Sequence, residues 1–199
     1  KCGMLEKARD IIDELSLEDI VSWNTVIAGY AHLGHARGVL NLFSKMMGRG
    51  MVPNSITFLV LLTTCSHAGL PEVGQRVFDI MVKVYDLTPS LEHYACMVDL
   101  LSRAGHLVKA IVVIEKVSSV DRIQLWLAFL GACQKWMNVE LGIWAFEQAM
   151  ELDANCASAY VCMGNIYAVA GMHSEAEKLD ALRMRNDIAC KIPIHLLVD

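Results

Sequence analysis

Glycine recurs along this chain at a nearly constant spacing. From one copy of the pattern to the next, the spacings are 31, 35, 36, 32 and 34 residues. In one copy, Met137 stands where glycine is expected. The glycines at the repeated position are Gly3, Gly34, Gly69, Gly105 and Gly171. A period of roughly 20–50 residues is typical of repeat proteins, so the pattern predicts an array of similar structural repeats.

A small residue follows each repeated position by five residues. The glycine at the repeated position suits a helix end, where the chain needs a left-handed residue. A small side chain in the next helix lets two helices approach closely. Each period therefore predicts a helix, a tight turn and a second helix. Five of the six small positions hold Ala or Gly, and the set is Ala8, Val39, Gly74, Ala110, Gly142 and Ala176.

Apolar residues follow the helical period within these repeats. The spacings i, i+3, i+4 and i+7 are those of one helix face. Two such faces are predicted, at Val26, Ile27, Tyr30 and Leu33 and at Phe58, Leu61, Leu62 and Cys65. Helix pairs this short cannot bury their own apolar faces, so the repeats are expected to stack on one another.

Prolines are expected to mark helix boundaries. Pro71 follows a turn glycine and suits the first position of a helix, where its missing N–H is harmless. Pro53 and Pro89 are expected to stop the second helix of a repeat. No strand alternation of useful length is present. The predicted fold class is all-α.

Composition narrows the functional classes. Apolar residues make up 55% of the chain and charged residues 20%, which argues against disorder. The longest apolar runs, 56–65 and 125–133, are shorter than the roughly 18–20 residues that span a bilayer, so no membrane partner is expected. The net charge of −5 disfavours binding nucleic acid mainly through phosphates. Seven cysteines without a C-x-x-C are expected to be buried apolar residues in a reducing compartment.

Several segments resemble a known repeat family. Residues 21–31, 36–47 and 50–54 resemble a pentatricopeptide repeat (PPR). Segments 56–58 and 64–70 look like the long, L-type variant, and 91–105 resembles the short, S-type variant. The resemblance implies a right-handed superhelical solenoid of stacked helix–turn–helix repeats.

The C-terminal part resembles the two extension (E) motifs that end plant PLS-class PPR proteins. Trp126, 131–133, 138–142 and 151–153 match the first motif, and 159–161, 164–168 and 170–171 match the second. Departures from the family pattern are Met137, Ala154, 172–175 and the tail. The predicted organisation is a partial S-type repeat (1–19), a P-type repeat (20–54), an L-type repeat (55–90), an S-type repeat (91–122), extension motifs (123–156 and 157–190) and a degenerate tail (191–199).

The family resemblance implies single-stranded RNA binding at one base per repeat. In that family the fifth and last residues of a repeat select the base, and the resemblance implies that the second residue stacks on it. For repeat 20–54 these residues are Asn24, Asn54 and Val21, a combination that implies a pyrimidine preference. Repeat 55–90 has Leu59 and Ser90 with Ile56 for stacking, and repeat 91–122 has Ala95 and Arg122. Leu and Ala cannot hydrogen-bond a base edge, so only the first repeat is expected to read a base well.

The resemblance further implies C-to-U RNA editing in a mitochondrion or plastid. In this interpretation the RNA is organellar, and a deaminase or editing cofactor docks in trans on residues 123–190. The chain lacks H-x-E with a downstream P-C-x-x-C, the signature of a zinc deaminase. It is not predicted to be an enzyme, and no cofactor or metal is expected. Since the chain begins at Lys1 inside a helical pattern, it is expected to be a fragment of a longer array.

Other interpretations stay open at this point. The whole chain could be a protein-binding scaffold of the tetratricopeptide kind, although those repeats hold near 34 residues. Gene decay, with an inactive product, is a further alternative. Asn24 could be a polar helix-start residue, as Ser22 could. His32, His35 and His67 lack the partners of a known metal site.

Aromatic residues and thiols also have two interpretations. The four tryptophans could stack on bases, but Trp23 and Trp126 occupy equivalent helix-start positions where packing is favoured. Cys65 and Cys133 lie on apolar helix faces, without the nearby base that a nucleophile needs.

Overall fold

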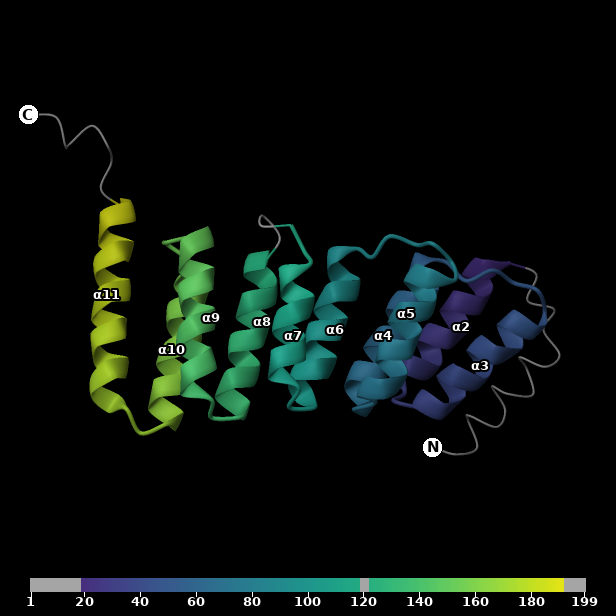
Figure 1. Ribbon diagram of the computed structural model, residues 1–199, viewed down its shortest axis with the longest axis horizontal. Helices are drawn as coiled ribbons and strands as arrows, with labels where there is room; N and C mark the ends of the chain where they lie inside the picture. The colour runs from purple at the N-terminus through teal and green to yellow at the C-terminus, as the bar shows by residue number, and fades with distance from the viewer. Residues whose placement is uncertain (1–18, 119–121, 192–199) are drawn as a thin grey trace, which may run out of the picture. The chain divides into compact units, whose positions relative to one another are not determined.

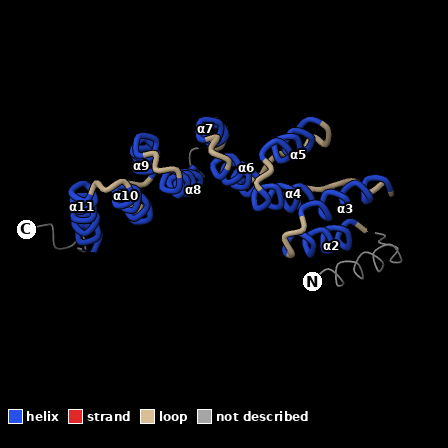
Figure 2. Tube along the Cα trace, turned by 90° about the horizontal axis from the view of Figure 1, so that it is seen from below, coloured by secondary structure: helices blue, strands red, loops and turns tan. Residues whose placement is uncertain are grey.

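The computed structural model describes residues 19–118 and 122–191, with side chains described up to Arg185. Within these ranges every regular element is an α-helix, as Figure 2 shows. The predicted partial repeat 1–19 and tail 191–199 fall almost entirely outside the described residues. The helices are α2 (Ile20–His32), α3 (Ala36–Gly48), α4 (Ser55–Ala68), α5 (Pro71–Lys83), α6 (Leu91–Arg103), α7 (Leu107–Glu115), α8 (Arg122–Lys135), α9 (Val139–Leu152), α10 (Ala157–Val169) and α11 (His173–Lys191).

The chain divides into two compact units, which we call the N-terminal unit (Lys1–Cys96) and the C-terminal unit (Met97–Asp199). In the N-terminal unit, α2 packs on α3 and α4, and α4 packs on α5. In the C-terminal unit, α8 packs on α9 and α10, and α10 packs on α11. Figure 1 shows α8 joined to α9, and α10 joined to α11, by short turns. Helix pairs stacked on helix pairs make each unit a piece of an all-α repeat solenoid, as predicted.

The predicted turn glycines adopt the left-handed conformation. Gly34, Gly69, Gly105 and Gly171 have φ angles of 71°, 66°, 80° and 75°. Met137, at the remaining copy of this turn within the described residues, also has a positive φ, of 50°. A side chain with a Cβ is strained in this region, at a cost of roughly 1–2 kcal/mol. The repeat pattern therefore identified correctly both the turns and the one copy that departs from glycine.

The buried residues confirm most of the predicted helix faces. In the N-terminal unit, Phe58, Leu61 and Leu62 are fully buried and Cys65 is 1% exposed. Trp23 is fully buried and Trp126 is 2% exposed, which confirms packing as their role. In the C-terminal unit, Trp126 also meets Trp144 edge-to-face, with ring centroids 5.0 Å apart. Such aromatic pairs stabilise a core beyond the area they bury.

Two boundary predictions need correction. Leu33 was expected on a buried face, but it caps the end of α2 and is 66% exposed. Pro53 and Pro89 do not themselves stop the helices, because α3 ends at Gly48 and α5 ends at Lys83. The chain reverses earlier, through positive φ angles of 77° at Gly50 and 51° at Asp86. Pro71 does lie at the start of α5, as predicted.

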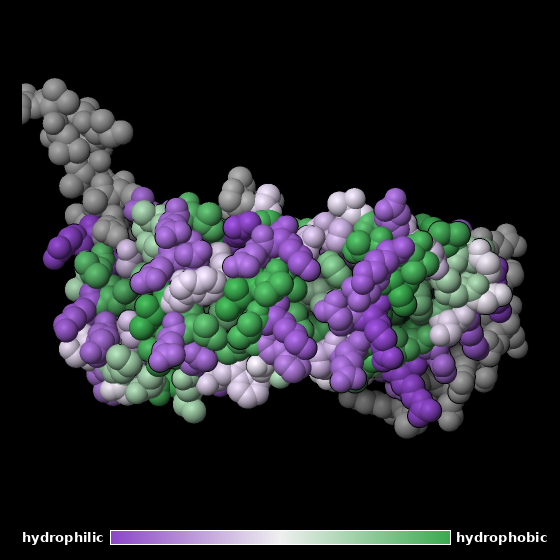
Figure 3. Space-filling model, in the orientation of Figure 1, coloured by the Kyte–Doolittle hydropathy of each residue, from purple (hydrophilic) through white to green (hydrophobic). Residues whose placement is uncertain are grey.

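The surface mixes apolar and polar side chains. Figure 3 shows the two kinds interspersed over the face it presents. A search of the described residues found no helix both long and apolar enough for a membrane crossing.

Candidate functional site

The start of α2 is capped by an acidic side chain. Asp19 accepts a hydrogen bond from the backbone N–H of Ser22 (2.8 Å) and one from its hydroxyl (2.9 Å). The backbone bond holds the pKa of the Asp19 carboxyl below its usual value. Asn24 is the fifth residue of α2 and is only 7% exposed. The interpretation of Asn24 as a helix-start residue is therefore wrong, because Asp19 has that role.

Asn54 caps the start of α4 through a reciprocal arrangement with Thr57. The Asn54 Oδ1 accepts from the Thr57 backbone N–H (3.0 Å), and the Thr57 Oγ1 accepts from the Asn54 backbone N–H (3.2 Å). This is a capping box, which satisfies N–H groups that the first turn of a helix leaves unpaired. Asn54 is half-buried and Thr57 is fully buried.

Asn24 joins this cap from the neighbouring helix. Its Nδ2 donates to Asn54 Oδ1 (3.1 Å), and its Oδ1 accepts from the Thr57 hydroxyl (2.7 Å). The two asparagines selected from the sequence are thus in direct contact, although 30 positions separate them. Thr57 was not among the residues selected from the sequence. Its signal was Asn-x-x-Thr ahead of an apolar run, a pattern that predicts a capping box.

Two exposed aliphatic side chains lie beside this polar network. Val21, on the first turn of α2, is 69% exposed. Ile56, on the first turn of α4, is 58% exposed. Water-exposed aliphatic groups next to a hydrogen-bonded amide pair form a surface that suits a flat ligand with an apolar face and a polar edge.

The corresponding positions of the next repeat are arranged differently. Leu59 is half-buried and has no polar group to offer. The exposed Ser90 uses its hydroxyl within α6, at 2.5 Å from Glu92 Oε2 and 2.7 Å from His93 Nδ1. The bond from Ser90 lowers the pKa of the Glu92 carboxyl. His93 is 1% exposed, and its Nε2 lies 3.0 Å from the carbonyl of Ser55.

Arg122, the polar residue predicted to pair with Ala95, is also engaged. Its Nε donates to the carbonyl of Val117 (2.6 Å) and its Nη2 to the carbonyl of Glu115 (2.9 Å). These bonds satisfy backbone acceptors at the C-terminal end of α7, where helix carbonyls lack partners. The expectation that this position does not read a base is consistent with its geometry.

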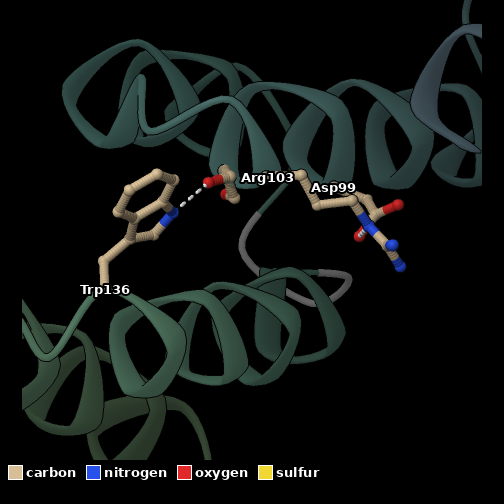
Figure 4. Close-up of polar contacts among 4 residues, drawn as sticks. Asp99, Arg103 and Trp136 are labelled. Atoms are coloured by element: carbon tan, nitrogen blue, oxygen red, sulfur yellow. Dashed lines mark hydrogen bonds and ion pairs between the residues drawn. The ribbon is translucent and has the colours of Figure 1, made fainter. Parts of the chain in front are cut away.

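A tryptophan in the C-terminal unit links one helix pair to the next. The Trp136 indole N–H donates to the carbonyl of Ser102 (2.7 Å), as Figure 4 shows. Its ring lies on Gly105, where an added Cβ would be 3.3 Å from the indole. Asp99 and Arg103 point away from the ring and pair with each other (2.7 Å). Trp136 is 46% exposed, but both its N–H and one ring face are in use.

The geometry gives little support to a nucleophilic thiol or to a histidine metal site. Burial raises the pKa of the Cys65 thiol to about 11 and that of Cys133 to about 12, so both stay neutral and poorly nucleophilic near pH 7. His35 uses its Nδ1 to cap α3, accepting from the Gly38 N–H (3.0 Å). Across residues 19–118 and 122–191, no group of three or more His, Cys, Asp or Glu is placed to hold a metal ion.

Comparisons with known proteins agree with this architecture. Residues 18–67 match the PPR repeat family and residues 136–195 match the E motif. A mitochondrial pentatricopeptide repeat-containing protein of Arabidopsis thaliana is 42% identical over 188 residues, which are 94% of this chain and 29% of that protein. A chloroplastic one from the same plant is 37% identical over 194 residues, 96% of this chain and 26% of that protein. The chain thus spans less than a third of the length of either relative.

Solved structures share the fold. The crystal structure of the pentatricopeptide repeat protein PPR10 from maize matches with a TM-score of 0.67 and 21% identity, covering 94% of this chain and 28% of that one. The same protein in complex with an 18-nt psaJ RNA element matches with a TM-score of 0.66 and 18% identity, covering 96% of this chain and 32% of that one.

Proposed function

The chain belongs to the pentatricopeptide repeat family, and from that premise we propose that it binds single-stranded RNA. Repeat 20–54 contacts one base, with Asn24 and Asn54 at the base edge and Val21 and Ile56 against its faces. The observation that carries the proposal is the hydrogen-bonded pair of Asn24 and Asn54, together with the exposed Val21 and Ile56 in the first turns of α2 and α4. The Watson–Crick edge of an unpaired base offers acceptors to amide N–H groups.

The charge of the chain supports recognition through the base. A net charge of −5 gives little general attraction for phosphates. A contact made by neutral amides and aliphatic groups depends weakly on salt, whereas phosphate binding weakens steeply with it. One base contact contributes roughly 1–3 kcal/mol. This segment therefore adds specificity to an array in which other repeats share the binding.

The residues of the later repeats support separate roles for the two parts of the chain, RNA binding and protein docking. At the fifth position of their helices, α4, α6 and α10 hold Leu59, Ala95 and Val161, which cannot hydrogen-bond a base. Ser90 belongs to the proposed interface by position, but its hydroxyl is engaged with α6. In this proposal residues 123–190, which overlap most of the E-motif match, dock a deaminase or editing cofactor. The full protein then specifies sites of C-to-U editing in a mitochondrion or plastid, the compartments named for its relatives.

The test measures binding of the purified chain to oligocytidine, oligouridine and oligoadenosine of equal length, at two salt concentrations. The variant Asn24→Ala removes the proposed contact. Asn165→Ala, an exposed asparagine on α10, is the matched control. We expect weak binding that prefers pyrimidines, changes little with salt and is lost only in Asn24→Ala.

A different result would redirect the assignment. If the folded chain binds none of these RNAs at high protein concentration, the result favours a protein-binding scaffold. The next experiment would then be a search for protein partners of residues 123–190. Binding that falls steeply with salt and is equal in both variants would show phosphate attraction in place of base reading.

A further inference from the structure

We propose that Thr57 is a positioning residue that fixes how the Asn24 and Asn54 amides face, so that the pair presents N–H donors to the base. The inference rests on the proposed function of the same site, and it concerns a residue of the following repeat. Thr57 is fully buried, so it acts through the asparagines and not by touching RNA.

The orientation of the Asn54 amide follows from its contact with Thr57. The oxygen and nitrogen of an asparagine amide are assigned from their partners. The backbone N–H of Thr57 can only donate, and the Asn54 atom 3.0 Å from it must accept. That atom is therefore Oδ1, and Nδ2 occupies the other position of the Asn54 amide.

The orientation of the Asn24 amide follows from that of Asn54. Because Asn54 presents an acceptor, the Asn24 atom 3.1 Å away must be the donor Nδ2. The Asn24 oxygen then faces the Thr57 hydroxyl at 2.7 Å. That hydroxyl has one hydrogen, and Asn24 Oδ1 is closer than Asn54 Oδ1, which lies at 3.0 Å. Thr57 thus holds both amides, one by its backbone N–H and the other by its hydroxyl.

The remaining hydrogen-bonding capacity is on the donor side. Asn54 Nδ2 has no hydrogen-bond partner among the described residues, which leaves both its hydrogens available. Asn24 Nδ2 has one further hydrogen beyond its bond to Asn54. Cytosine and uracil each present two acceptors on the Watson–Crick edge, whereas adenine presents one. A pair held as donors therefore favours pyrimidines for a physical reason.

The next repeat shows why Thr57 is needed for this arrangement. His93 occupies the third position of α6, as Thr57 does in α4. Its ring contacts Ser90 and the backbone carbonyl of Ser55. The reading position there is Leu59, so no amide is available to orient. Of these two boundaries, only the one between repeats 20–54 and 55–90 couples a buried hydroxyl to a reading amide.

The experiment compares Thr57→Val, Thr57→Ser and the control Thr64→Val. Thr64 is a buried threonine of the same helix, and its hydroxyl donates to the carbonyl of Val60. The readout is the ratio of affinities for oligocytidine and oligoadenosine, measured on the 199-residue chain. Without the hydroxyl the Asn24 amide keeps only its bond to Asn54 and is held less firmly, so we expect Thr57→Val to lower this ratio about 5-fold, the equivalent of one lost hydrogen bond. Thr57→Ser and Thr64→Val should keep the wild-type ratio.

The outcomes separate this inference from the proposed function. If the wild type prefers pyrimidines through Asn24 and Thr57→Val keeps the same ratio, Thr57 has no positioning role. If the wild type shows no Asn24-dependent preference, the proposed function itself fails. Should Thr57→Val not fold, NMR of the wild type decides: the Thr57 hydroxyl proton that bonds to Asn24 is expected to be protected from exchange with water, and a freely exchanging hydroxyl overturns the proposal.

Discussion

The two units join one helix pair to the next with different atoms. In the N-terminal unit the link consists of polar side chains at helix starts, where Asn24 bonds to Asn54 and Thr57. In the C-terminal unit the link is a turn residue, Trp136, which bonds to the carbonyl of Ser102 and lies on Gly105. Side chain meets side chain in the first case, and side chain meets backbone in the second.

The two links differ in whether their polar groups keep hydrogen-bonding capacity for a ligand. The asparagine pair keeps N–H donors that its own bonds do not consume. The Trp136 indole has a single N–H, which the Ser102 carbonyl takes. A repeat link can therefore carry base recognition only when it is made by groups with hydrogen-bonding capacity to spare. This explains physically why we place RNA contact in the N-terminal unit.

The largest expected effect comes from removing an asparagine helix cap, and two caps are compared in separate variants. Asn54→Ala loses the cap of α4 and leaves the buried Asn24 amide without an acceptor, so the free energy of unfolding should fall by roughly 2–3 kcal/mol. Asn138→Ala removes the cap of α9, which accepts only from the Leu141 N–H, and should cost about 1 kcal/mol. Urea unfolding of both variants measures the difference. Equal losses would mean that the contact with Asn24 adds nothing to the cap.

The second prediction concerns the packing of Trp136. Gly105→Ala places a Cβ at positive φ and 3.3 Å from the indole, so we expect a loss of about 2 kcal/mol. Gly171→Ala is the matched control, because its φ is similar but no atom lies within 4 Å of the added Cβ. It should lose only about 1 kcal/mol, for backbone strain alone. A Gly171→Ala variant as unstable as Gly105→Ala would show that the Trp136 contact is unimportant.

Periodicity made the helices and turns predictable, because both depend on local sequence. Positive φ at Gly69 and at Met137 follows from their place in the repeat. Burial of Phe58 follows from helical spacing. The contact between Asn24 and Asn54 is different, because it joins two helices and came from the resemblance to a repeat family. Thr57 escaped notice since its backbone role is local but its bond to Asn24 depends on how α2 packs on α4.

The third prediction tests the Trp136 hydrogen bond without disturbing the turn. Trp136→Phe keeps an aromatic ring on Gly105 and removes the N–H that donates to Ser102. We expect a loss of about 1 kcal/mol in unfolding free energy, the value of one hydrogen bond. The affinity for pyrimidine oligonucleotides should not change, because the link in the C-terminal unit does not read bases. Altered base preference in Trp136→Phe would remove the distinction between the two links.

The smallest effect is a gain in stability at the neighbouring residue. Met137 has a φ of 50° and is 66% exposed, so its side chain adds little packing while its Cβ strains the turn. Met137→Gly relieves that strain, but it also adds freedom to the unfolded chain, and the two effects leave a net gain of up to about 1 kcal/mol. Met137→Ala keeps the Cβ and should leave stability nearly unchanged. If Met137→Gly gains nothing over Met137→Ala in thermal and urea unfolding, the turn is unstrained. If it gains as expected, this turn becomes equivalent to the one at Gly69.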